Sequence, residues 1–173
     1  MSLFNQILNA IDNPEQEAST GQLNNILDTV QQLGSSYQTQ PSSIESAMSI
    51  VGNFTRSALK EQRNQRGQTQ VQQLINSFAG NQASSQAINA LFSSSQLQAM
   101  IQQISSRTGL NAVTIQRMLP ILVPLVLNML KTGNNTRTTQ AGNPVLNSFL
   151  DTDGDGDVDV ADAMRMASRY LGR

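Results

Sequence analysis

Six aspartates lie within twelve residues near the C-terminus, in the stretch DTDGDGDVDVAD. They are Asp151, Asp153, Asp155, Asp157, Asp159 and Asp162. In a twelve-residue loop they occupy positions 1, 3, 5, 7, 9 and 12, with Gly156 at position 6, which is the oxygen-ligand spacing that wraps a hard cation. Because carboxylates this close repel one another, we expect a divalent ion to order the stretch.

This spacing is that of an EF-hand loop and predicts one bound Ca²⁺ ion. Calcium accepts six to eight oxygen ligands at variable distances, whereas magnesium demands a stricter octahedron. Val158 falls at position 8, where an apolar residue packs the loop against its own helices. Asp162 stands where an EF-hand usually has glutamate, so its shorter side chain either draws the following helix closer or binds through one oxygen. The alternative is a solvated acidic turn or a disordered tail that holds no ion.

Helices are expected on both sides of the loop. Pro144 suits the first position of a short entering helix behind Asn143, and residues 161–171 predict an exiting helix with Met164 on its apolar face. The whole stretch LDTDGDGDVDVADAMRMASRYLGR resembles one repeat of a dockerin. Dockerins have two such repeats and this chain has one, so the resemblance does not imply a cohesin partner.

The composition excludes most catalytic chemistry. The chain has no cysteine and no histidine, which rules out disulfides, thiol nucleophiles, zinc sites of the Cys/His type and histidine general bases. The closest glutamates, Glu15 and Glu17, open a predicted helix, where negative charge is favoured by the helix dipole. We therefore predict a protein that is not an enzyme.

Charge is segregated along the chain although the net charge is −1. Residues 1–45 hold five acidic residues and no basic one, residues 46–150 hold eight basic residues and one acidic, and residues 151–173 hold six acidic and three basic. A basic middle between acidic ends could attract nucleic acid, or it could attract the acidic ends of the same chain. The alternative is an ordinary solvated surface on which these charges bind nothing.

Apolar residues recur at helical spacing through residues 1–131, and no segment alternates as a strand does. Asn13 and Pro14 predict the start of a helix that ends at Gly34. Ser42 and Glu45 predict a capping box for a long helix. The basic residues Arg56, Lys60, Arg63 and Arg66 are expected to form a basic stripe on or just beyond the exposed face of that long helix.

Residues 95–119 resemble a helix-turn-helix, because Gly109 can end one helix and Asn111 can cap the next. Ser93 and Gln96 predict a capping box at the start of the first of these helices. If this segment bound DNA, its candidate contacts would be Arg107, Asn111, Thr114, Gln116 and Arg117. Any tight helical hairpin shows the same pattern, so DNA association is the alternative function and not the preferred one.

The most apolar segment, Met118 to Leu130, predicts a central buried helix or an oligomer interface. Pro120 and Pro124 are expected to kink this helix or to start a new one. A run of about thirteen residues is too short to span a bilayer, which needs roughly twenty, and the N-terminus lacks the pattern of a secretory signal. We therefore expect a cytoplasmic protein without a membrane span.

The motifs SLFNQILNAI, TGL and LPILVPLVLNMLK together resemble the bacterial YidB-like family of uncharacterised proteins. That resemblance implies an all-helical fold and no known activity. We predict an all-α multihelical bundle over residues 1–131 with a central apolar helix, a linker over residues 132–143, and an EF-hand-like or dockerin-like calcium module over residues 144–173.

The predicted function is that of a non-catalytic, calcium-responsive interaction or scaffold protein. Ion binding would order the C-terminal module and expose or create a docking face for a protein partner or a second copy of the chain. The residues expected to form this docking face are Met164, Met166, Tyr170 and Leu171.

Overall fold

The computed structural model describes residues 3–13, 19–80, 82–132, 143–151 and 160–172, and these form helices and short connections without a strand. The described helices are α1 Leu3–Asp12, α2 Thr20–Ser36, α3 Pro41–Arg66, α4 Gln68–Phe78, α5 Ser85–Leu91, α6 Ser94–Thr108, α7 Ala112–Lys131, α8 Pro144–Asp151 and α9 Val160–Tyr170. The predicted all-α class is confirmed.

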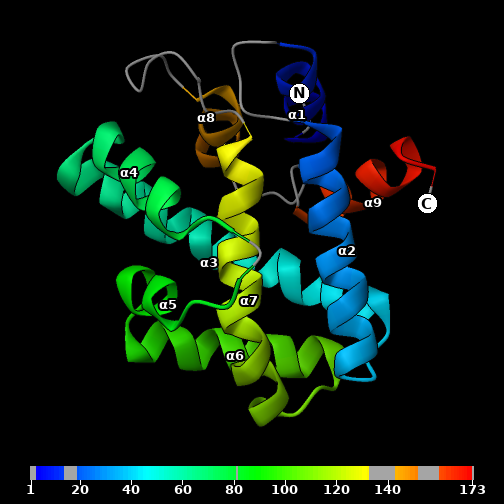
Figure 1. Ribbon diagram of the computed structural model, residues 1–173. Coiled ribbons are helices and arrows are strands. Elements are labelled where there is room, and N and C mark those ends of the chain that lie inside the picture. The colour runs from blue at the N-terminus through cyan, green and yellow to red at the C-terminus, as the bar shows by residue number, and fades with distance from the viewer. Residues whose placement is uncertain (1–2, 14–18, 81, 133–142, 152–159, 173) are drawn as a thin grey trace.

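Helix α7 runs through the middle of the molecule, with α2 along one side and α3 crossing it (Figure 1). Every residue from Leu122 to Leu130 is buried. By length and composition alone α7 could cross a membrane, but 67% of the tested stretch is buried inside the molecule, as in the core helices of soluble proteins. Helix α7 has 20 residues and is therefore longer than the apolar run of about thirteen residues, Met118 to Leu130, from which the sequence predicts a central helix.

Both prolines lie inside α7, which continues through them, so the expectation that a proline starts a new helix is wrong. Pro124 has no N–H and cannot donate to the carbonyl of Pro120, four residues earlier. The backbone N–H of Ser84 donates to that carbonyl instead at 2.8 Å, and the N–H of Gly80 reaches the carbonyl of Pro124 at 3.3 Å. The connection between α4 and α5 thus compensates for the missing helical hydrogen bond.

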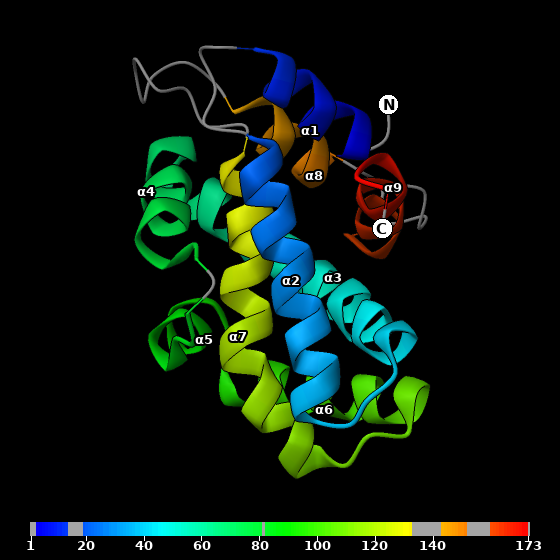
Figure 2. The ribbon, with the colours of Figure 1, turned by 45° about the vertical axis from the view of Figure 1, so that its right-hand side comes forward.

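Helices α8 and α9 belong to the same apolar core as the rest of the bundle. Their buried residues Val145, Leu146, Phe149, Val160 and Ala163 are part of one cluster with those of α1, α3 and α7. Helix α1 lies across α8 and beside α9 at one end of the molecule (Figure 2). The proposed division into a bundle, a linker and a calcium module stays a prediction, because most of residues 132–143 lie outside the described ranges.

Two local expectations on the N-terminal half are wrong. Helix α2 is capped by Ser19, whose hydroxyl accepts from the N–H of Gln22 at 3.1 Å, while Pro14 lies outside the described residues. Helix α3 begins at Pro41 without a side-chain cap, so there is no capping box of Ser42 with Glu45. In each case a different residue nearby supplies the helix start.

The predicted basic stripe on α3 also requires a correction. Arg56 is buried, with 7% of its surface exposed, and it faces α8 instead of solvent. Lys60 and Arg63 are half-buried, and Arg66 alone of the four is exposed. Arg56 is buried because its side chain binds a backbone carbonyl and an aromatic ring of α8, which a sequence pattern along α3 cannot reveal.

Candidate calcium site and its surroundings

The predicted ion loop connects α8 to α9. Helix α8 ends at Asp151 and α9 begins at Val160, so Asp151 and Asp162 belong to the two helices. The intervening candidates Asp153, Asp155, Asp157 and Asp159 lie outside the described residues. Within the described part of the chain no group of three or more Asp, Glu, His or Cys side chains could hold a metal ion. The ligand set therefore stays a prediction from the sequence.

Asn143 fixes the start of the entering helix, as the sequence predicts. Its side-chain oxygen accepts from the backbone N–H of Leu146 at 2.9 Å, which caps α8. Its side-chain nitrogen donates to the carbonyl of Leu130 at 2.9 Å and to the amide oxygen of Gln72 at 3.2 Å. One buried amide thereby joins the start of α8 to the end of α7 and to α4.

Arg56 holds the other end of α8. Its Nε donates to the backbone carbonyl of Phe149 at 2.8 Å, and its guanidinium carbon lies 4.8 Å from the centroid of the Phe149 ring. The Phe149 carbonyl is among the last four of α8, which have no partner within the helix. A cation at this end of a helix is also favoured by the helix dipole.

The exiting helix rests directly on the backbone of α3. A Cβ atom on Gly52 would lie 2.7 Å from Cγ2 of Val160, the first residue of α9. Further along, Nε of Arg165 donates to the carboxylate of Glu45 at 2.9 Å. This ion pair is partly solvated, so its contribution to stability is small.

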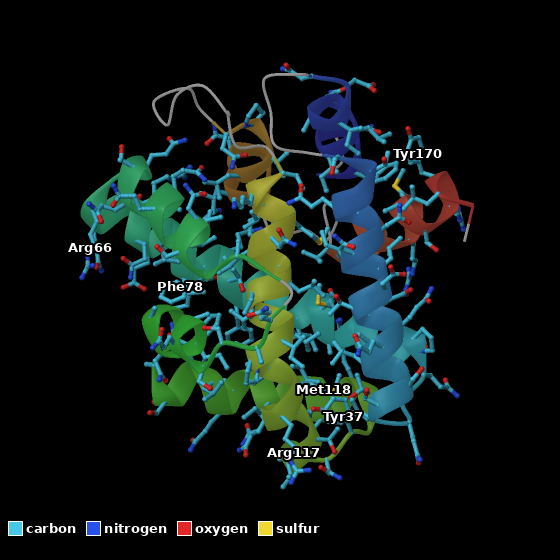
Figure 3. The ribbon with its side chains drawn as sticks, in the orientation of Figure 1. Tyr37, Arg66, Phe78, Arg117, Met118 and Tyr170 are labelled. Atoms are coloured by element: carbon cyan, nitrogen blue, oxygen red, sulfur yellow. The ribbon has the colours of Figure 1, made fainter. Side chains whose placement is uncertain are left out.

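The expected docking face on α9 is divided between the core and the surface. Met164 is buried, with 3% of its surface exposed, so it packs inside the protein and is not part of a surface. Met166 and Tyr170 are 39% and 52% exposed, and Leu171 is half-buried. Figure 3 shows Tyr170 at the end of the molecule where α1 lies, and its ring meets that of Phe4 edge to face, with centroids 6.2 Å apart.

The turn between α6 and α7 has the predicted local structure. Gly109 adopts a left-handed conformation with φ of 74°, and Asn111 caps α7 by accepting from the N–H of Thr114 at 2.8 Å. The predicted capping box of Ser93 with Gln96 is present at the start of α6. The helix caps and the turn at Gly109 occur both in DNA-binding helix-turn-helix segments and in other tight helical hairpins. They therefore do not distinguish between the two.

The nucleic-acid candidates are only partly available at the surface. Arg107, Gln116 and Arg117 are exposed, but the side-chain oxygen of Asn111 is engaged in its cap and Thr114 is half-buried. Arg117 and Arg66 lie at different edges of the molecule (Figure 3). Arg66 at the end of α3 and Arg117 at the start of α7 therefore do not belong to one patch.

A polar groove of about 440 Å³ lies between α3 and α6. Its lining residues are Ile50, Asn53, Ala99, Gln102, Gln103, Ser106 and Arg107. Amides and one guanidinium can bind a polar ligand, but this set offers no group that titrates near neutral pH and could act as a general base. The groove therefore adds no catalytic constellation to the site.

Two residues that position the C-terminal helices, Gly52 and Arg56, were not identified from the sequence as such. Both lie on α3, about a hundred residues from the segments they contact. The sequence shows only that Arg56 follows Gly52 by four residues on a helix face that is otherwise apolar. This spacing places both residues on one face of the helix, but it does not indicate which segment packs against that face.

No protein-family model matches this chain, and neither does any curated protein or solved structure. The resemblances to the YidB-like family and to a dockerin repeat therefore rest on the quoted motifs alone.

Proposed function

We propose that this protein binds one Ca²⁺ ion through residues 151–162 and acts as a non-catalytic interaction or scaffold protein. The observation that carries the proposal is the spacing of six aspartates and Gly156 between two helices, α8 and α9. Side chains of Asp151, Asp153, Asp155 and Asp162 would supply oxygen ligands. The carbonyl of Asp157 would be a further ligand, and Asp159 would bind directly or through water.

A partner would dock on the exposed part of α9. Met166 and Tyr170 are exposed large apolar side chains, and methionine adapts its shape to a contact surface. Ion binding would favour the conformation in which α9 is docked on α1 and α3, and so fix how these two side chains are presented. The partner is a protein or a second copy of this chain.

Calorimetry on chelator-stripped protein tests the ion site. We expect one ion per chain with an affinity of micromolar or weaker, since paired sensor sites lie at about 10⁻⁷ to 10⁻⁵ M and this loop carries Asp162 at its last position. Asp151→Ala should abolish the binding heat or weaken the affinity strongly. The absence of calcium heat in the parent at millimolar ion, or the same isotherm in Asp151→Ala, would refute the ion site.

The second candidate is DNA association, favoured by the exposure of Arg107, Gln116 and Arg117 around the tight α6–α7 turn. Phosphate contacts release counterions, so DNA binding must weaken steeply with salt, whereas apolar docking changes little. A duplex gel-shift titration at moderate salt separates the two. Sub-micromolar binding that is lost in the double variant Arg107→Ala, Arg117→Ala would favour DNA association over docking.

A further inference from the structure

The polar groove between α3 and α6 has a volume of about 440 Å³ and is lined by no residue of α8 or α9. Helix α6 lies at the end of the molecule opposite to α1 and α8 (Figure 1). The groove residues of α6 recur three or four positions apart, so they share one face of that helix. They are Ala99, Gln102, Gln103, Ser106 and Arg107. This face is therefore a separate surface from the exposed residues of α9.

The polar side chains of this face are not used by the fold. Those of Gln102, Gln103, Ser106 and Arg107 are exposed, and they make no hydrogen bond or ion pair with another described residue. On the α3 side, the side-chain oxygen of Asn53 is 3.5 Å from a guanidinium nitrogen of Arg56, and its amide nitrogen donates to no described residue. The groove thus offers both donors and acceptors to a ligand.

Arg107 is the one charged residue that lines the groove. It lies in the last turn of α6, where the helix dipole favours a cation. A guanidinium binds a carboxylate through two parallel hydrogen bonds. One cation among neutral amides matches a ligand with a single negative charge better than a doubly charged phosphate, which prefers several cations or a helix N-terminus.

The groove contains no aromatic side chain, so it has no surface on which a nucleobase could stack. Its apolar lining is small. Ile50 is buried, with 3% of its surface exposed, and Ala99 contributes a single methyl group. A primary amide donates and accepts hydrogen bonds as a peptide group does. Three such amides beside one guanidinium therefore match a peptide that ends in a free carboxylate.

We propose that the groove between α3 and α6 binds the C-terminal carboxylate of a peptide. The guanidinium of Arg107 pairs with the carboxylate, and the side-chain amides of Asn53, Gln102 and Gln103 bind the peptide groups before it. Volumes of about 300 to 1,000 Å³ are usual for ligand sites, and the groove lies in that range. Because the groove is open and the ligand small, we expect a dissociation constant of about 1 mM.

Nuclear magnetic resonance of the isotope-labelled full chain tests the proposal. The probe is a pool of N-acetylated tripeptides built from Ala, Leu, Ser and Gln with free C-terminal carboxylates, added to about 10 mM, ten times the expected dissociation constant. The side-chain amide signals of Asn53, Gln102 and Gln103 should shift. The same pool with C-terminal amides lacks the charge and should bind about tenfold more weakly or less. Chelator is present throughout, so the result does not depend on the proposed calcium site.

Two variants with matched controls locate the contact. Arg107→Gln removes the charge and should weaken binding of the carboxylate pool by about tenfold or more. Arg117→Gln changes an exposed arginine that does not line the groove and should bind as the parent does. Ala99→Met fills the groove and should also weaken binding, whereas Ala90→Met, on the exposed surface of α5, should not.

Several results would overturn the proposal. These are signals that stay in place at the highest pool concentration, equal shifts with the amide pool, and unchanged affinity in Arg107→Gln. Acetate or N-acetylalanine that binds as tightly as the pool would assign the groove to any small carboxylate and not to a peptide. A DNA duplex that shifts the same signals at a lower concentration than the pool would assign it to nucleic acid.

Discussion

Thr55 is a polar residue in the middle of the apolar core. Its side chain is fully buried in α3, and no hydrogen-bond partner for its hydroxyl is found among the described residues. An unsatisfied buried hydroxyl costs about 1 to 3 kcal/mol. Two other buried polar residues, Asn143 and Arg56, have several partners each and therefore connect helices that are distant in the sequence.

We predict that Thr55→Val raises the free energy of unfolding by about 1 kcal/mol, because valine has a similar shape and no hydroxyl to satisfy. Urea unfolding measured by circular dichroism checks it. Thr29→Val is the matched control, because the Thr29 hydroxyl donates to the carbonyl of Asn25 at 2.8 Å and its removal should bring no gain. A loss of stability in Thr55→Val would mean that the hydroxyl has a partner in solution.

At the scale of elements, α7 organises the bundle. Leu122 lies at its centre and is 1% exposed, whereas Val113 in its first turn is 57% exposed. Leu122→Asp buries an unpaired carboxylate and should cost more than about 4 kcal/mol, enough to unfold many domains of this size. Val113→Asp should change stability by less than about 0.5 kcal/mol. Equal stability of the two variants would mean that Leu122 is not buried and that α7 is not the central helix.

Local rules predicted the elements whose signals lie within a few residues. The Ser93 and Gln96 box, the Gly109 end and the Asn111 cap all follow from short-range hydrogen bonding and backbone preference, and all are present. The long-range choices could not be predicted. Glu45 pairs with Arg165 instead of capping its own helix. Arg165 lies 120 residues further along the chain, so short-range rules cannot identify it as the partner.

The candidate site also has features that the sequence predicts and contacts that it cannot predict. The proposed aspartate ligands are predicted from their spacing alone. The spacing also predicts a helix on each side of the loop, and the structure contains these helices as α8 and α9. That Met164 packs inward and that α3 carries the contacts to both helices depend on which faces meet in three dimensions. Amphipathic spacing shows that a face is buried without showing against what.

At the scale of the whole molecule, α8 and α9 share one apolar core with the bundle. An ion that orders the connection between them should therefore stabilise the whole chain and not only its C-terminal segment. Binding to the folded state alone adds about 2.7 kcal/mol at a hundred times the dissociation constant. For a chain of this length that is equivalent to a rise of about 5 to 10 °C in Tm.

Thermal unfolding of chelator-stripped protein, with and without millimolar calcium, tests whether the folded chain binds Ca²⁺ at residues 151–162. We expect a single transition whose Tm rises by about 5 to 10 °C with calcium in the parent chain and stays constant in Asp151→Ala. Magnesium at the same concentration should give a smaller rise, because it needs a stricter octahedron of ligands. A parent Tm that is the same with and without calcium would refute the proposed ion site.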